Sequence, residues 1–90
     1  DLVNSFSLSQ NYPNPFNPTT NINFNLPVSA NVSLKVYNLL GQEVQSLLNE
    51  ARTAGSYTVK FDARNLASGV YFYRLEAGSF VTQRKMTLIK

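Results

Sequence analysis

The chain has 90 residues, of which 43% are hydrophobic and 14% charged, a composition that predicts one folded domain and argues against disorder. It contains no cysteine and no histidine, so disulfides and thiolate metal sites are excluded and the commonest catalytic bases and nucleophiles are missing. The net charge of +3 is mild and the cations are scattered, which makes nucleic acid a poor candidate partner.

The outer limits of the domain are predicted from its first residues and its hydropathy. No signal peptide opens the chain, and no apolar run reaches the length that spans a membrane. We interpret residues 1–5 as a linker from an upstream domain, and residues 6–90 as the domain itself.

A short strand and a stiff connector come first. Residues 5–10 alternate between apolar and polar side chains, which predicts a strand. Residues 11–18 hold three prolines, each of which fixes φ and removes a backbone donor, so this connector should be extended. We expect Tyr12 and Phe16 to tuck under the edge of the fold.

Two strands with regular alternation follow, over residues 19–26 and 32–36, with a turn between them over residues 27–31. One face of each strand is apolar and the other is polar. The side chains predicted to face the core are those of Ile22, Phe24, Leu26, Val32, Leu34 and Val36.

The next segment is a hairpin with an ambiguous second arm. Asn38 to Gly41 predicts a type I turn that ends on a glycine with positive φ. In the segment 43–49, Val44, Leu47 and Leu48 also fit helical spacing together with Leu40, so an amphipathic helix is the alternative. A strand is favoured, because Gly41 would break a helix early and both neighbouring segments are strands.

The second half of the chain begins with a turn at residues 54–55 and a strand over residues 57–61. Residues 62–68 then form a crossing loop, with room for one helical turn capped by Asp62. The strand 69–75 is the most apolar of the chain. We expect its Tyr71, Tyr73 and Leu75 to face the core, with Tyr71 placed as a tyrosine corner.

The last segment is a hairpin that ends in a basic strand. Residues 77–79 predict a tight hairpin in which Gly78 suits a primed turn. In the strand 80–90, Met86 and Leu88 share a face. Ile89 points the other way, which indicates a bulge or a covered outer face.

These segments add up to seven short strands and turn signals every 8–12 residues. The fold class predicted is therefore all-β, a seven-stranded antiparallel immunoglobulin- or fibronectin-like β-sandwich.

Catalysis finds little support in the residues. The five acidic residues lie on separate segments without paired spacing, so a carboxylate pair would need an accident of folding. Solvated strand edges are the simpler explanation for them. We expect no enzyme activity, no cofactor and no metal site.

Two non-catalytic functions, sugar binding and a structural spacer, are candidates. Tyr37, Tyr57, Tyr71 and Tyr73 could form a sugar-stacking platform, although tryptophan is absent and tyrosines in small sandwiches usually fill core or corner positions. A structural spacer module of a secreted enzyme is the other alternative.

Positive charge gathers at the end of the chain, at Arg84, Lys85 and Lys90. These cations could protect an edge strand against aggregation, or they could mark a terminal strand that is offered to a receptor groove. The residue pattern alone leaves the two readings open.

Three motifs in a fixed order favour recognition by a receptor over protection of a strand edge. They are residues 10–20 (QNYPNPFNPTT) with Ile22 and Phe24, residues 36–44 (VYNLLGQEV), and residues 68–75 (SGVYFYRL) closing on residues 85–90 (KMTLIK). Together they resemble the C-terminal sorting domain (type A) of type IX secretion system cargo proteins of Bacteroidetes-like bacteria.

The resemblance implies an immunoglobulin-like, non-enzymatic sorting signal. Its implied partners are the outer-membrane translocon or its shuttle, a sortase-like peptidase that removes the domain, and the upstream cargo domain. The cargo would pass the periplasm and outer membrane and be secreted or held at the cell surface, with cleavage upstream of Phe6. By motif match, the residues implied in translocon recognition are Gly69, Tyr71, Lys85, Met86, Leu88 and Lys90.

Overall fold

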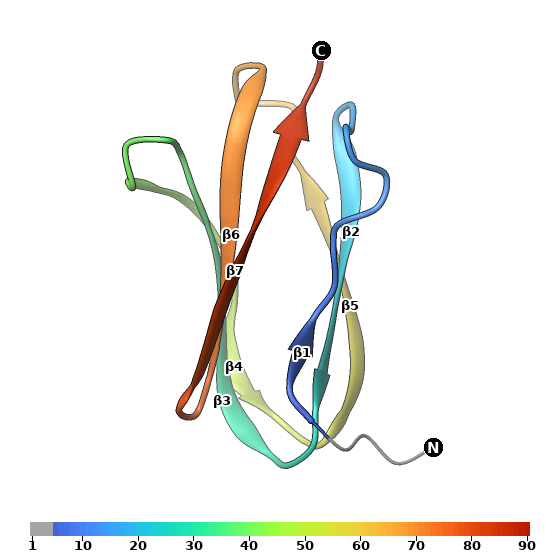
Figure 1. The fold of residues 1–90 in the computed structure, drawn as a ribbon, viewed down its shortest axis with the longest axis vertical. Helices are drawn as coiled ribbons and strands as arrows, with labels where there is room; N and C mark the ends of the chain where they lie inside the picture. Colours follow the sequence, from blue (N-terminus) through green and yellow to red (C-terminus); the bar gives the residue numbers. More distant parts are fainter. Residues whose placement is uncertain (1–4) are drawn as a thin grey trace.

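In the computed structural model, which describes residues 5–90, seven β-strands run along one long axis (Figure 1). The described part of the chain contains no helix. The strands are β1 (Ser7–Leu8), β2 (Thr19–Leu26), β3 (Ala30–Tyr37), β4 (Glu43–Arg52), β5 (Gly55–Asp62), β6 (Gly69–Ala77) and β7 (Phe80–Leu88).

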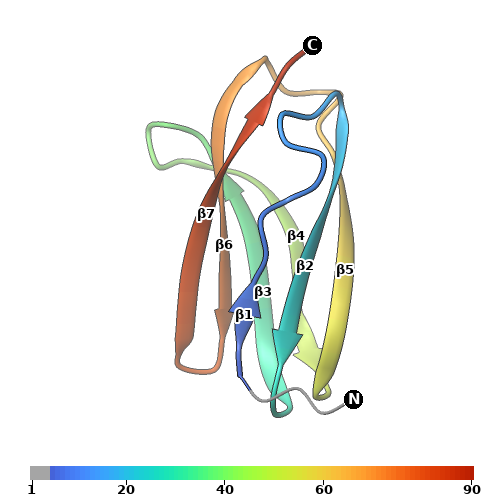
Figure 2. The ribbon, with the colours of Figure 1, turned by 45° about the vertical axis from the view of Figure 1, so that its right-hand side comes forward.

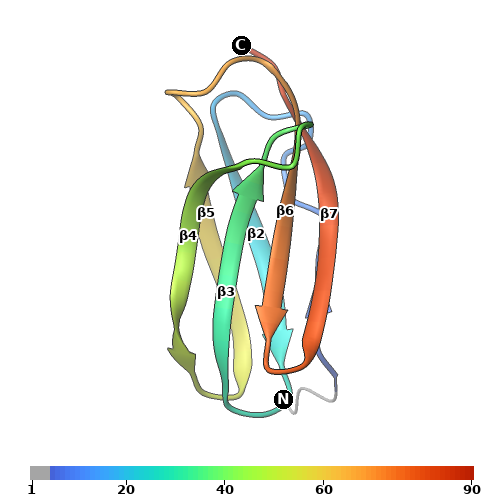
Figure 3. The same cartoon turned by 90° about the vertical axis from the view of Figure 1, so that its left-hand side faces the viewer.

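The strands form two antiparallel sheets packed face to face. One sheet has the order β1-β2-β5 and the other the order β4-β3-β6-β7, so the chain changes sheet after β2, β4 and β5. Figure 3 shows the four-stranded sheet in front, with β2 and β5 behind it. The predicted seven-stranded immunoglobulin- or fibronectin-like sandwich is confirmed.

The core is built from alternate residues of the inner strands, as period-two patterning requires. All the core positions predicted in residues 22–36 are fully buried or nearly so, and so are those predicted in β6. Burying one such side chain contributes about 1.5–3 kcal/mol. The largest buried side chains belong to Tyr73, Phe16, Phe24 and Phe61.

β4 is a strand, and its pairing with β3 explains why its sequence also fitted a helix. The register between the two strands shifts twice, between Leu34 and Lys35 and between Val36 and Tyr37. Each shift adds a residue to β4 and turns the following side chains to the other face. Val44, Leu47 and Leu48 can therefore all pack against the core although their spacing is not two.

Both glycine turns predicted from the sequence are present. Gly41 has a φ of 81° and its amide donates to the carbonyl of Asn38 at 3.0 Å. Gly78 has a φ of 60°, while Ser79 does not have positive φ, which is the pattern of a type II′ hairpin turn.

Some local expectations were wrong. The first strand covers only Ser7–Leu8, because its regular pairing with β2 ends at the bond from the Ser9 amide to the Asn23 carbonyl and returns only as the isolated bridge of Tyr12 to Asn21. The loop 63–68 has one hydrogen-bonded turn, from the Leu66 amide to the Ala63 carbonyl, and Asp62 Oδ1 accepts from the Arg64 amide at its start as a cap would, but no helix forms. β7 pairs with β6 without a bulge, and Ile89 lies beyond its end, 53% exposed.

The connector expectation was half right. Phe16 is buried at 2% exposure, whereas Tyr12 is 79% exposed. Tyr12 pairs with Asn21 through both of its backbone groups, so its ring points to solvent and Asn11 fills the interior position instead. The predicted linker falls largely on residues 1–4, outside the described residues. Over residues 5–90, no helix has the length and hydrophobicity needed to cross a membrane.

Candidate functional site

The two ends of the sandwich are built differently. The upper end in Figure 1 carries the connector 12–18, the hairpin loop 38–42, the loop 63–68 and Lys90, and we call it the distal end. The opposite end, here the proximal end, carries three turns of two or three residues, at 27–29, 53–54 and 78–79, and the start of the described chain. The three motifs of the family resemblance therefore all reach the distal end.

The connector joins the two sheets at this end (Figure 2). Tyr12 pairs with Asn21 of β2, and Phe16 forms a parallel bridge to Leu88 of β7. The Phe16 amide donates to the Thr87 carbonyl at 3.0 Å, and the Ile89 amide donates to the Phe16 carbonyl at 2.9 Å. The peptide bonds before all three prolines of the connector are cis.

Two side chains of the connector segment complete this contact. Asn14 accepts a hydrogen bond from the Thr87 amide through Oδ1 at 3.0 Å, and Gln10 donates from Nε2 to the Lys85 carbonyl at 2.8 Å. The outer edge of β7 from Lys85 to Ile89 is thus bonded to the chain's own connector. The last strand therefore presents side chains here, and not the free strand edge that the sequence suggested for a receptor groove.

Two tyrosines of β6 hold the segments that lead to the distal end. The buried Tyr73 hydroxyl donates to the Ser9 carbonyl and accepts from the Asn11 amide, both at 2.7 Å. Burial raises the pKa of this phenol. The Tyr71 hydroxyl donates to the Ala67 carbonyl four residues upstream at 2.7 Å, which is the bond of a tyrosine corner.

Four of the six residues predicted for recognition form two opposed pairs between β6 and β7. Gly69 lies opposite Leu88, and Tyr71 lies opposite Met86. Tyr71, Met86 and Leu88 are buried, at 8% exposure or less. These three side chains pack the distal part of the core, and in the folded domain they are not available to a partner.

The other three predicted residues are exposed. Gly69 has a φ of 152°, a conformation that strains other residues, and open space where a Cβ would project. Lys85 lies on the outer face of the sheet, opposite Phe72. The Lys90 amide donates to Ser68 Oγ at 3.0 Å, and its ammonium bonds the carbonyl of Arg64.

Among the described residues, the cations without an ion-pair partner are concentrated near the end of the last strand. Each acidic side chain of residues 5–90 takes part in an ion pair, with Lys35, Arg52, Arg64 or Arg74 as its partner. Within that range the cations without such a partner are Lys60, Arg84, Lys85 and Lys90, so three of the four lie in the last seven residues. At the start of the loop 63–68, Asp62 accepts hydrogen bonds from the amide and the guanidinium of Arg64, and these bonds lower the pKa of the Asp62 carboxyl.

The sequence analysis missed one feature, the exposure of two leucines in the hairpin loop 38–42. Leu39 and Leu40 at its tip are 68% and 81% exposed. The turn was predicted, but Leu40 was counted with the helical spacing of the next segment and Leu39 was given no role. Two adjacent leucines inside a predicted turn were the available signal, because turns seldom bury their central side chains.

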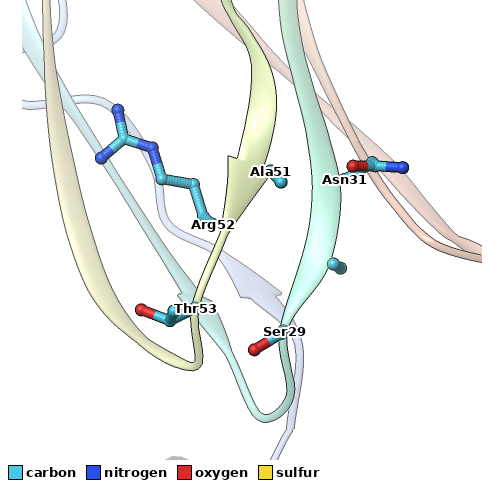
Figure 4. A pocket seen from close by; sticks show the side chains of 6 residues that line it. Ser29, Asn31, Ala51, Arg52 and Thr53 are labelled. Atoms are coloured by element: carbon cyan, nitrogen blue, oxygen red, sulfur yellow. The ribbon is translucent and has the colours of Figure 1, made fainter.

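The tyrosines do not form a common exposed platform. Tyr71 and Tyr73 are buried, and Tyr57 is half-buried and stacks on Phe24 with ring centroids 5.4 Å apart. A hollow of about 400 Å³ at the proximal end has no aromatic lining (Figure 4). Its lining consists of Ser29, Ala30, Asn31, Ala51, Arg52 and Thr53. Among residues 5–90 no three potential metal ligands of the His, Cys, Asp and Glu types come together.

Comparison with known proteins identifies the family. A family model described as the secretion system C-terminal sorting domain matches residues 10–90. Searches of the curated proteins and of the solved structures gave no significant match. Because the family match covers nearly all of the sequence, and because its motifs meet at one end of an all-β sandwich, the chain belongs to the C-terminal sorting domains of type IX secretion.

Proposed function

We propose that this domain is a non-catalytic address tag, read in its folded form at the distal end by the outer-membrane translocon of the type IX system or its shuttle. Family membership indicates the coarser function: a sorting signal that interacts with the secretion machinery and leads to export across the outer membrane. The family is generally non-catalytic. The observation that carries the finer proposal is the meeting of three separated motifs at one end of the fold.

The course of the chain supports recognition at the distal end. The described chain starts at the proximal end, so an upstream cargo domain would be attached there (Figure 1). In this proposal the receptor meets the distal end, on the side away from the upstream cargo domain. The distal end also carries the excess of positive charge, which favours fast and oriented encounter with an acidic partner.

The six predicted recognition residues have two kinds of role in this proposal. Tyr71, Met86 and Leu88 act indirectly, by packing the core beneath the recognised surface. Lys85 and Lys90 are the side chains offered for contact. Gly69 acts through its backbone, which turns the chain from the loop 63–68 into β6.

The tag can be tested with a secreted reporter that carries residues 1–90 at its carboxyl end, in a bacterium with a type IX system. We expect surface or medium delivery of the parent fusion and periplasmic retention of the double variant Lys85→Glu, Lys90→Glu. Lys60→Glu on β5 is the matched control, because Lys60 also has no ion-pair partner within residues 5–90. This variant should be exported normally. Normal export of the double variant would refute this role of the two lysines, and failure of the parent fusion would refute the tag.

Point variants are better than truncation for this purpose. Deleting Lys85–Lys90 should also leave the cargo in the periplasm, but the deletion removes the buried Met86 and Leu88 and the strand that holds the connector. Retention could then come from unfolding alone. The charge-reversed variants leave the core untouched and remove only the exposed bond from Lys90 to the Arg64 carbonyl, so circular dichroism should show an unfolding midpoint close to that of the parent.

We further propose that a sortase-like peptidase removes the domain at the surface by cutting upstream of Phe6. A cut there would separate the cargo from the whole folded unit, since Phe6 already packs against the core and stacks on Phe80 at 5.0 Å. Mass spectrometry of the surface-bound cargo gives the test. A carboxyl end within or before residues 1–5 is expected, whereas cargo that keeps β1 and β2 would contradict cleavage at this place.

A further inference from the structure

The hairpin loop 38–42 holds its tip in one conformation. Asn38 Oδ1 accepts hydrogen bonds from the amides of Leu40 at 2.9 Å and Gln42 at 3.0 Å. The Asn38 carbonyl also accepts from the Gly41 amide, and the Asn38 and Gln42 side chains bond each other at 2.9 Å. A loop with this many internal bonds has lost its conformational entropy before any partner arrives.

This fixed loop presents its apolar side chains to water. Leu40 is 81% exposed and Leu39 is 68% exposed, so neither contributes much to the stability of the fold. A loop needed only to join β3 to β4 would gain solubility from polar residues at these places. The two leucines therefore suit a role in binding, where burial against a partner would be favourable.

A hollow of about 240 Å³ lies directly beside this tip. Tyr37 and Phe72, opposed neighbours on the outer face of β3 and β6, line it together with Leu39 and Gly41. The apolar tip and the aromatic-lined hollow make one continuous surface with a projection and a recess. Surfaces of that shape and composition resemble the anchor regions of protein interfaces.

The charges around this surface specify the partner further. Two of the cations on this face of the sheet are already neutralised, Lys35 by Glu43 at 3.4 Å and Arg74 by Glu76 at 3.1 Å. The second pair is an ion pair only, because Arg74 Nε makes no hydrogen bond. Lys85 lies opposite Phe72 and has no ion pair within residues 5–90. The surface thus offers one available ammonium beside its apolar centre.

We propose that Leu39 and Leu40 anchor this domain in an apolar pocket of a protein of the secretion machinery, which places a carboxylate against Lys85 and a side chain in the hollow. This inference rests on the proposed function and adds the contact surface and the chemistry of its receptor. A lipid surface is the less suitable occupant, because it gains nothing from a recess of fixed shape.

The test uses the same reporter fusion with Leu40→Asp, Leu40→Met and Val28→Asp. Leu40→Asp should lower the ratio of exported to periplasmic reporter about tenfold or more, as for loss of a hot-spot side chain. Leu40→Met keeps the apolar contact and should be exported normally. Val28, 57% exposed in the turn at the proximal end, is the matched control for an aspartate in place of an exposed apolar residue.

The outcomes separate this inference from the function on which it rests. Normal export of Leu40→Asp beside normal export of the parent would overturn the anchor and leave the tag in place, while failure of the parent would overturn both. Should Leu40→Asp lower the unfolding midpoint, Leu39→Ser with Leu40→Ser replaces it with the same expectation. Flotation with vesicles of phosphatidylethanolamine and phosphatidylglycerol should show no leucine-dependent binding, and such binding would overturn the protein pocket.

Discussion

The distal and proximal ends of this sandwich solve the same problem, joining antiparallel strands, in opposite ways. The proximal end uses turns of two or three residues, such as the Gly78 turn, whose geometry alone closes the hairpin. The distal end uses segments of five to seven residues and stabilises each with side-chain hydrogen bonds from Asn14, Asn38, Asp62 or Tyr71.

Longer loops lose more conformational entropy on folding, so a fold needs compensating contacts to keep them in place. This domain concentrates those contacts at the distal end, while at the proximal end the Tyr57 hydroxyl donates to the Thr53 carbonyl of the turn 53–54 at 2.6 Å. Under the proposed function, the bonded distal segments keep the shape that a receptor would recognise, whereas the proximal turns serve to reverse the chain. Each of the following predictions tests that difference.

The largest effect is expected at Phe16, the residue through which the connector reaches the core. Phe16→Ala removes a ring that is 2% exposed and lies 6.0 Å from the Phe61 ring, and should lower the free energy of unfolding by about 3–5 kcal/mol. Tyr12→Ala, in the same connector but exposed, should stay within about 0.5 kcal/mol of the parent. Urea titration measures both, and equal effects would mean that the connector is not anchored through Phe16.

The next effect concerns Tyr73. Tyr73→Phe leaves the Asn11 amide and the Ser9 carbonyl without their shared partner, and should cost about 1–3 kcal/mol. Tyr71→Phe loses a single bond to a carbonyl in a more open place, and should cost about 0.5–1.5 kcal/mol. Denaturation at neutral pH would contradict this ranking if Tyr71→Phe were the more damaging change.

Tyr73 also predicts an alkaline limit to stability. Burial raises its pKa in the folded state, so the unfolded state loses this proton first, near the ordinary tyrosine value of about 10. The contribution is complete below that pH and declines as the pH rises through the folded pKa. The unfolding midpoint of the parent should therefore fall more steeply above pH 10 than that of Tyr73→Phe, and parallel curves would show that Tyr73 is not the cause.

The two glycine turns sharpen the comparison between the ends. Gly41→Ala and Gly78→Ala both place a side chain at positive φ with no atom within 4 Å of the new Cβ, so each should cost about 1–2 kcal/mol from the backbone alone. Matched losses of stability are thus expected from thermal unfolding. Export of the reporter should suffer from Gly41→Ala only, and equal export defects would remove the distinction between the two ends.

The smallest effect is expected at Asp62. Arg64 lowers the pKa of this carboxyl, so the pair stabilises the fold above the ordinary aspartate pKa and less as the pH falls through the lowered value. Both side chains are accessible to water, which keeps the gain small and sensitive to salt. Asp62→Asn should shift the unfolding midpoint only slightly at neutral pH, and less still at acid pH. A shift that grew on acidification would contradict the sign.

Much of the fold could be predicted because its signals are local. Alternation identified β2 and β3, and a glycine in the required conformation marked each hairpin turn. The register shifts in β4 could not be predicted, since a bulge is decided by pairing with β3 and not by the residues of β4. The burial of Asn11 in place of Tyr12 depends likewise on a distant contact, the hydroxyl of Tyr73.

The candidate site, like the fold, could be predicted from the sequence only in part. The motifs were visible in the sequence, but the motif match did not separate Met86 and Leu88, which pack in the core, from Lys85, which is exposed on the outer face of β7. The pairing of the connector with β7 joins residues more than seventy positions apart, and no local pattern contains it. The turn around Leu40 was predictable, but the Asn38 bonds that fix its tip are visible only in the folded loop.

Crosslinking in cells tests most directly whether the distal end is the one that the secretion machinery reads. A photoreactive side chain is placed in the exported fusion at Leu40 or Lys85 on the distal end, or at Val28 or Ser79 on the proximal end. Adducts with a component of the type IX translocon or its shuttle are predicted from the distal positions and not from the proximal ones. Adducts from Val28 or Ser79, with none from Leu40 and Lys85, would contradict this orientation.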